Sequence, residues 1–155
     1  MAAASLPPLR ASSWRALLLG LGAAWNAPNT LLGLVAGAFG CLLGAHLRWQ
    51  PQVCALVFGR MPWPGRGGAL TLGNVILHTG ERLDVACLTY AHRAGHGAEP
   101  AIRLADHERA HVFQSMVLGP LFLPLYLLCG GVSVRNPFEQ AADRYARHGC
   151  GWWPG

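Results

Sequence analysis

Residues 100–120 read PAIRLADHERAHVFQSMVLGP, and the fold prediction starts from this stretch. A proline stands where a helix would open and a Gly-Pro pair where it would end, so the sequence predicts one helix between them. The helix contains His107-Glu108-Arg109-Ala110-His111, an H-E-x-x-H sequence. Residues four apart lie one turn apart on the same helix face, so both imidazoles can reach one metal ion.

Zinc is the metal expected at this motif. It accepts neutral imidazole nitrogen, and a catalytic zinc usually has a third protein ligand and a bound water. The pKa of that water falls to about 7, and a neighbouring carboxylate can take its proton as the water attacks a carbonyl. The sequence therefore predicts zinc ligands at His107 and His111, with Glu108 as the catalytic acid and base. The alternative is a helix whose polar residues cap or pair locally, but such residues are costly to bury without a partner.

The acidic residues downstream of this helix are Glu139 and Asp143, which stand four apart. Here the sequence resembles the gluzincin branch of zinc metallopeptidases, the thermolysin-like group. In that branch H-E-x-x-H is followed on a later helix by a ligand glutamate, with an aspartate four residues on. The resemblance implies that Glu139 is the third zinc ligand and that Asp143 orients a zinc-bound histidine. It covers two short helices only, and it is similar to the very small membrane-bound members.

Each of these two carboxylates also has a local interpretation. Asn136 as a helix cap with Glu139 three residues later is a capping-box arrangement, and Asp143 could pair with Arg147. Against this, two like charges four apart on a helix cost a few tenths of a kcal/mol, which a shared cation or the histidines would remove.

The apolar segment between the two helices limits the topology. If residues 115–134 crossed a bilayer as a straight helix, Glu139 would lie roughly 30 Å from His111, whereas zinc bonds are about 2 Å long. Two prolines and the pair Gly130-Gly131 interrupt the segment. We therefore expect a re-entrant apolar hairpin at 115–134 that returns the chain to the metal site.

The composition points to a membrane. The chain of 155 residues is 52% hydrophobic and 12% charged, with a mean hydropathy of +0.29. An ordinary globular domain carries about 25% charged residues. All basic residues are arginines that stand singly, so no nucleic-acid surface is expected, and their positions beside apolar stretches fit contact with membrane lipid.

Residues 1–13 are expected to be disordered, and residues 14–47 to form a membrane anchor, either a transmembrane helix or a helical hairpin. A signal peptide is the alternative, but the apolar character resumes after Asn26-Ala27-Pro28-Asn29, which favours a retained segment. The predicted location is integral, in a cytoplasmic or inner membrane. Four glycines recur on nearly one face, which would allow close approach of another helix and an oligomer (Gly33, Gly37, Gly40, Gly44).

Residues 48–155 are expected to form a minimal zincin-like domain, which makes the whole chain a membrane-associated α+β protein. Strands are predicted at Gln52–Phe58 and Ala69–His78, with Leu83–Tyr90 as a third strand or a helix and 91–99 as a loop. The last helix is expected from Asn136-Pro137 to about His148. The strand Ala69–Leu77 could present an edge to an extended peptide.

The function predicted from these patterns is a membrane-associated, zinc-dependent metallopeptidase-like hydrolase that acts on a peptide or protein. His148 or Tyr145 could assist an oxyanion. The alternative is a non-catalytic membrane protein in which zinc, or the polar cluster alone, joins the two helices. A third possibility is a small membrane protein with a chance motif.

Overall fold

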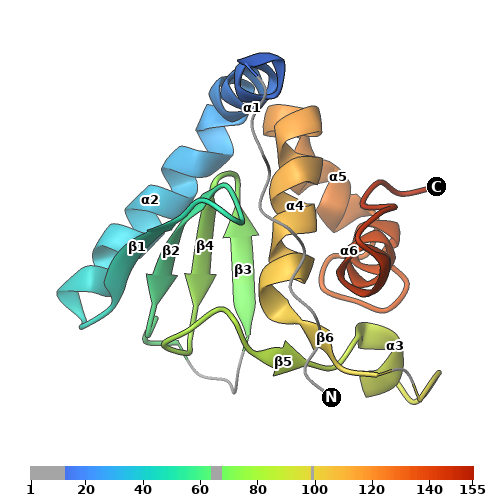
Figure 1. The fold of residues 1–155 in the computed structure, drawn as a ribbon. Coiled ribbons are helices and arrows are strands. Elements are labelled where there is room, and N and C mark those ends of the chain that lie inside the picture. The colour runs from blue at the N-terminus through green and yellow to red at the C-terminus, as the bar shows by residue number, and fades with distance from the viewer. Residues whose placement is uncertain (1–12, 64–67, 99) are drawn as a thin grey trace.

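A small mixed β-sheet separates two groups of helices in this α+β chain (Figure 1). The computed structural model describes residues 13–63, 68–98 and 100–155. Of the segment 1–13 that was predicted to be disordered, residues 1–12 lie outside the described residues, and Ser13 begins a helix. One side of the sheet packs on α2 (Ala27–Leu42), and the other packs on α4 (Leu104–Leu118), which carries the H-E-x-x-H sequence.

The sheet has the strand order β1-β2-β4-β3. Strands β2 and β4 are parallel, and the other neighbours are antiparallel. Strand β3 is therefore at an edge, and it is the strand that lies beside α4 (Figure 1). The remaining elements, in chain order, are α1 (Ser13–Trp25), β1 (His46–Gln50), β2 (Ala55–Gly59), β3 (Ala69–Leu72), β4 (Val75–His78), β5 (Ala86–Cys87), α3 (Tyr90–Arg93), β6 (Ile102–Arg103), the 3-10 helix η1 (Gly119–Leu121), α5 (Phe122–Leu128) and α6 (Pro137–His148).

Two of the predicted strands differ from the structure because of local turns. The segment Ala69–His78, predicted as one strand, is the hairpin β3–β4, since Gly73 turns the chain with a φ of 65°. The strand predicted from Gln52 begins only at Ala55, because residues 51–54 form a turn in which Cys54 has a φ of 55°. Of the stretch Leu83–Tyr90, only β5 is a strand.

The start of the motif helix was also predicted wrongly. Pro100 does not open it, because β6 pairs with β5 and holds residues 102–103 extended, so that α4 begins at Leu104. The segment 91–99, predicted as a loop, includes most of α3, whose first turn is capped by the Thr89 hydroxyl accepting from the His92 amide.

Residues 14–47 do not form one spanning helix. They form α1, α2 and the beginning of β1, and the two helices meet at Asn26. Asn26 is buried and donates to the Ser115 hydroxyl at 3.0 Å, while Asn29 donates to the carbonyl of Gly119 at 2.7 Å. These polar contacts hold the corner between α1 and α2 against the end of α4, which explains the break.

The glycine face of α2 is turned toward the chain's own sheet. A Cβ at Gly33 would lie 2.6 Å from the Cβ of Val75, one at Gly37 would meet the Phe58 ring, and one at Gly40 would lie 2.5 Å from Met61 Sδ. Gly44 follows the helix with a φ of 99°. The close approach that Gly33, Gly37 and Gly40 allow is therefore used within the chain, whereas Gly44 is exposed.

The apolar segment after α4 returns the chain to α4, as predicted. Helix α4 ends at Leu118, and Gly119 follows with a φ of 55°. The short helices η1 and α5 then lead through residues 129–136 into α6, where the Asn136 side chain accepts from the amide of Phe138 at 3.0 Å. The predicted start of the last helix, with an asparagine cap and proline in the first turn, is confirmed.

One helical stretch could cross a membrane by length and composition alone. Among the described residues this is Leu104–Leu128, which joins α4, η1 and α5. Much of it is the buried core helix of the chain, so it is weak evidence for a span. The segment 14–47 contributes only a shorter apolar helix, α2.

We expect Gly33→Ala to destabilise the fold. The new methyl group would overlap the Val75 side chain and lie 3.0 Å from the carbonyl of Leu72, so the sheet has to shift. Overpacking of this kind costs about 1–3 kcal/mol, which exceeds the helix gain of roughly 1 kcal/mol for alanine over glycine. Gly20→Ala on α1, where nothing lies within 4 Å, should leave stability unchanged or raise it. Urea denaturation followed by circular dichroism compares the two, and equal midpoints would contradict the packing of α2.

Candidate metal centre

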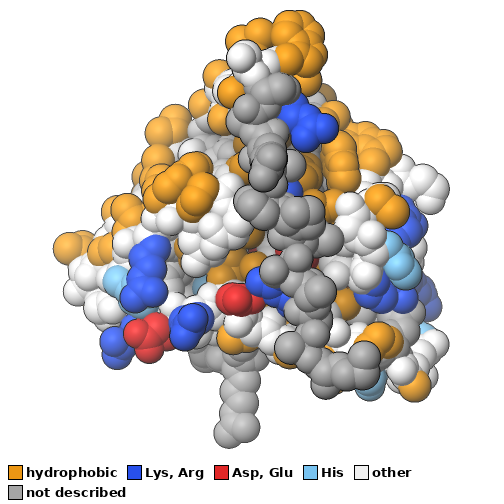
Figure 2. Space-filling view, in the orientation of Figure 1, with side chains coloured by type: hydrophobic (Ala, Val, Ile, Leu, Met, Phe, Trp, Pro, Cys, Tyr) orange, Lys and Arg blue, Asp and Glu red, His pale blue; other side chains and the backbone are white. Residues whose placement is uncertain are grey.

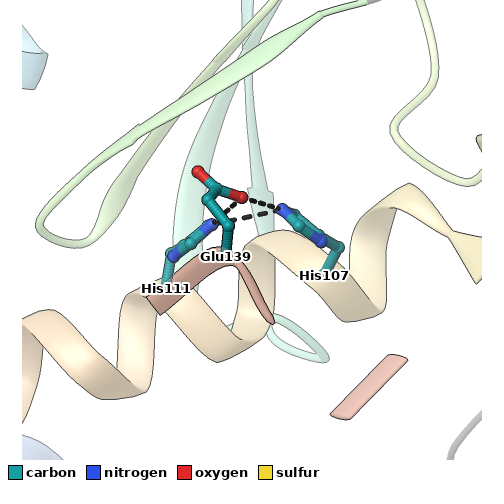
Figure 3. A group of neighbouring side chains, drawn as sticks. All are labelled: His107, His111 and Glu139. Atoms are coloured by element: carbon teal, nitrogen blue, oxygen red, sulfur yellow. Dashed lines mark hydrogen bonds and ion pairs between the residues drawn. The ribbon is translucent and has the colours of Figure 1, made fainter. Parts of the chain in front are cut away.

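Three buried side chains from two helices converge at one point (Figure 3). His107 and His111 project from α4, and Glu139 projects from the first turn of α6. Glu139 Oε2 lies 3.1 Å from His107 Nε2 and 3.3 Å from His111 Nε2. The two Nε2 atoms are 3.2 Å apart. His107, His111 and Glu139 are 5%, 6% and 2% exposed, so all three side chains are buried.

The spacing of these three atoms fits a metal ion. Ligands on a tetrahedral zinc ion with bonds of about 2.0–2.1 Å are separated by about 3.3–3.4 Å. The observed separations of 3.1, 3.2 and 3.3 Å are close to that value. The cluster can therefore hold a metal ion without rearrangement of the two helices.

Both imidazoles are oriented through their other ring nitrogen. His107 Nδ1 lies 3.0 Å from Asp143 Oδ1, and His111 Nδ1 lies 2.8 Å from Gln114 Oε1. The Gln114 amide nitrogen donates to the carbonyls of Phe138 and Trp152, so its oxygen must accept from His111. Each Nδ1 thus serves as a donor, which leaves each Nε2 lone pair for a metal.

Hydrogen bonds hold the carboxylates of Glu139 and Asp143 in place beside the histidines. Glu139 Oε1 accepts from the Tyr126 hydroxyl, and Asp143 Oδ2 accepts from the amide of Tyr90 at 3.0 Å. The cap of α6 comes from the Asn136 side chain, while the Glu139 carboxylate faces the histidines. Arg147 donates to the main-chain carbonyl of Asp143. The carboxylate contacts of Glu139 and Asp143 therefore differ from those of the local alternatives.

Burial and hydrogen bonding have opposite effects on the pKa values of His107 and Glu139. Burial disfavours a charged imidazole at His107, but hydrogen bonds to Asp143 and Glu139 outweigh it and raise the pKa of His107 to about 10. Burial likewise acts against ionisation of Glu139, yet the charge of His111 and the hydrogen bonds from both histidines hold the pKa of Glu139 well below its usual range. The site is therefore built around an ionised carboxylate.

Glu108 lies beside the cluster without being part of it. Its side chain is buried, and its Oε2 accepts from the hydroxyl of Thr71 at 2.6 Å. Thr71 is on the edge strand β3, so this bond connects the motif helix to the strand next to it. Glu108 also lines the two pockets described next.

A groove runs between β3 and α4 over these residues. On one side of Glu108 the pocket is walled by Leu70 and by apolar residues that follow α4 (Phe122, Leu123 and Val132). On the other side a second pocket is lined by Cys87, Leu88 and Arg93. Both pockets share Ala69, Tyr90, His107 and Glu108, so His107 and Glu108 lie where the two pockets adjoin, and the other two proposed ligands line the first pocket.

Four residues of this site were not predicted from the sequence: Thr71, Tyr90, Gln114 and Tyr126. Gln114 is three residues after His111, on the same helix face, and this spacing is a signal that could have identified it. The oxyanion role suggested for Tyr145 or His148 is not supported, because Tyr145 packs against Phe113 and Arg109 and His148 is exposed.

Gln114→Ala should weaken metal binding about 10–100-fold, the usual effect of losing a group that orients a ligand histidine. The change leaves His111 Nδ1 and the carbonyls of Phe138 and Trp152 without their partner. Gln140→Ala is the matched control, because its exposed amide donates to the carbonyl of Val134 and is not part of the cluster. Competition with a chromogenic chelator measures affinity, and thermal unfolding checks the fold. Equal affinities for the two variants would exclude this role for Gln114.

The chain was compared with known proteins in three ways. No protein-family model, no curated protein sequence and no solved structure matches it. A function for this chain is therefore argued from the geometry and chemistry of the site itself.

Proposed function

We propose that this protein is a membrane-associated, zinc-dependent metallopeptidase-like hydrolase. The observation that carries the proposal is the convergence of Glu139 Oε2 with the Nε2 atoms of His107 and His111, next to a glutamate that is not a ligand. Two imidazoles and one carboxylate form a ligand set that suits zinc. The resemblance of the two helices to the gluzincin motif supports the same proposal.

The ligand count supports a catalytic site over a structural one. Structural zinc sites are closed by four protein ligands, whereas catalytic sites have three and leave one position open. Within the described part of the chain, three side chains meet at this point, and they line a pocket. Bound zinc would polarise a carbonyl and lower the pKa of a water molecule.

Other residues of the chain would transfer protons, position the ligands and bind the peptide. Thr71 holds one oxygen of Glu108, so the other oxygen takes a proton from water and returns it to the leaving group. Asp143 and Gln114 keep the two imidazoles in place, and Tyr126 holds Glu139. The unpaired edge of β3 suits an extended peptide, whose backbone would hydrogen-bond to the strand beside the metal centre.

Tyr90 is the side chain best placed to stabilise an oxyanion. It lines both pockets of the groove, and its ring centroid lies 6.1 Å from that of His107. Burial, followed by the negative charges of Glu139 and Glu108, raises the pKa of Tyr90, so its hydroxyl keeps its proton at neutral pH. A protonated phenol can donate to the negative charge that develops on a carbonyl oxygen.

A non-catalytic role is the second candidate. The same hydrogen bonds tie α4 to α6 through His107, His111 and Gln114, so the cluster could serve only to join the helices. The two functions predict different outcomes when Glu108 is changed, because Glu108 is not part of the junction between α4 and α6.

Glu108→Gln should lower peptide hydrolysis by a factor of about 10²–10⁴, as expected for loss of a general base. The amide oxygen can still accept from Thr71, so zinc content and thermal stability should remain those of the wild type. Glu81→Gln, at an exposed position, is the control. Cleavage of a mixture of peptides is followed by mass spectrometry, with chelator removal and zinc restoration in parallel. A wild type that cleaves no better than Glu108→Gln would leave the junction role as the better account.

Tyr90→Phe should lower kcat roughly 10-fold or more with little change in KM, because the lost hydrogen bond forms in the transition state. Tyr145→Phe removes a hydroxyl of the same kind from a buried position outside the groove and should leave kcat unchanged. Steady-state kinetics on one cleaved peptide gives both constants. Similar kcat values for the two variants would rule out Tyr90 as the oxyanion donor.

A further inference from the structure

Large apolar side chains are exposed along one connected part of the molecule. This part, called the apolar roof here, consists of the outward faces of α1, α2 and the segment Gly119–Leu128. Val35 is 71% exposed, Leu42 82% and Leu128 83%. In Figure 1, α1 forms the ridge at the top, α2 slopes to the lower left and α5 lies on the upper right. Figure 2 shows hydrophobic side chains at the top and down the left flank, whereas most of the arginines in this view lie in the lower half and one lies near the top.

The roof has the properties of a surface that faces lipid. Residues 16–47 contain no Asp, Glu, Lys or Arg. The asparagines at the corner of α1 and α2 are buried and hydrogen-bonded to Ser115 and Gly119, so the polar groups point inward. Helical backbone satisfies its own hydrogen bonds, as lipid requires. Arg15, in the first turn of α1, is the one charged residue of α1 and α2. A ridge with two sloping sides and so little charge would need a matching concavity in a protein partner, whereas a fluid leaflet conforms to it.

The length of the helices limits how deep the roof can lie. A span of the hydrocarbon core needs about 20 residues of helix, equivalent to about 30 Å. Helix α1 has 13 residues and α2 has 16, and the buried face of α2 is fixed to the sheet. The roof therefore suits insertion into one leaflet, with the sheet outside the membrane.

A basic pocket lies where the roof ends. Strand β1 follows α2, and its Leu47 and Trp49 are exposed on the α2 side of the sheet. The alternate residues Arg48 and Gln50 line a cavity of about 220 Å³ on the other side, together with Gln52, Arg82, Leu83, Asp84, Arg103 and Ala105. Alternate residues of β1 therefore contribute to an apolar surface on one side of the sheet and to a basic pocket on the other.

Two of the three arginines in this pocket have no carboxylate partner among the described residues. Arg103 is neutralised, because its Nε donates to Asp84 at 2.9 Å and its guanidinium lies 3.6 Å from Asp106. Arg48 and Arg82 form no ion pair with any residue in the described ranges. Guanidinium groups bind phosphate oxygens in a bidentate manner, and the amides of Gln50 and Gln52 add further donors.

We infer that the apolar roof inserts into one leaflet of an anionic membrane and that the pocket between Arg48 and Arg82 binds the phosphate of a lipid headgroup. The charge of the pocket complements such a headgroup, and its position beside Leu47 and Trp49 places it at the level where apolar surface gives way to polar. This inference does not depend on hydrolysis, since it uses none of the residues of the metal centre.

Vesicle flotation of the full chain tests the inference. Protein in mild detergent is mixed with vesicles of phosphatidylcholine alone or of phosphatidylcholine and phosphatidylglycerol in equal parts, and the detergent is then removed. The wild type should float with both and partition more strongly into the anionic vesicles. Arg48→Glu and Arg82→Glu should each weaken anionic binding at least about fivefold and leave neutral binding unchanged. Arg93→Glu on α3, at the other end of the sheet, is the matched control.

A second pair of variants tests the roof itself. Val35→Glu with Phe39→Glu places two charges on the outward face of α2 and should abolish flotation with both kinds of vesicle. Ala98→Glu, at an exposed position far from α2 in sequence, should float like the wild type. Thermal unfolding and metal content in detergent show whether each variant is folded, so loss of binding is separated from loss of structure.

Four results would overturn the inference. Equal binding of anionic vesicles by Arg48→Glu, Arg82→Glu and Arg93→Glu would show that the pocket does not bind the lipid headgroup. Stabilisation of the detergent-solubilised protein by inorganic phosphate, with no effect of the two reversals on flotation, would assign the pocket to a soluble anion. A dimer that is soluble without detergent and does not float would assign the roof to a second copy. Protease accessibility of the chain from both sides of the vesicle would indicate a span.

Discussion

The contact of Glu139 with His107 and His111 is the constraint on which the rest of the structure depends. A carboxylate and two imidazoles are taken out of water between α4 and α6, at a cost of several kcal/mol for each uncompensated charge. Hydrogen bonds from Tyr126 to Glu139, and from the two histidines to Asp143 and Gln114, offset this cost. Because these partners come from α4, α5 and α6, all three helices have to meet at one point.

The return of the chain to this point depends on a second polar residue. Asn136 is fully buried, and its amide donates to the carbonyls of Tyr126 and Gly131 while its oxygen caps α6. It thereby fixes the distance between the end of α5 and the start of α6. Gly130 and Gly131 adopt φ values of 105° and 59°, which other residues rarely do, and this allows the turn before Asn136. A straight apolar helix from residue 115 to 134 could not have satisfied both ends.

The sequence predicted those parts that depend on local signals. The end of α4 at Gly119-Pro120 and the start of α6 at Asn136-Pro137 follow from residues within one turn of each boundary. The strand β6 was missed because its pairing with β5, about 16 residues earlier in the sequence, decides it. The hairpin at Gly73 was missed although Gly73-Asn74 between two apolar runs is a local signal for a two-residue turn. Gln114 differs, because its spacing from His111 is a local signal but its other two partners are distant. Its partners Phe138 and Trp152 lie 24 and 38 residues away in the sequence, so burial of its amide could not be inferred locally.

The predicted division into an anchor at 14–47 and a domain at 48–155 follows composition, whereas the contacts cross that boundary. Helix α2 packs through its glycines on β2 and β4, and Asn26 and Asn29 are bonded to the end of α4. On the other side, α5 has Leu127 and Leu128 exposed on the roof, while Tyr126 between α4 and α6 reaches the metal centre. Helix α5, with seven residues, is too short to be stable by itself, so contacts on both of its sides have to stabilise it. The surface proposed to face lipid and the proposed ligand Glu139 are therefore joined through a single turn of helix.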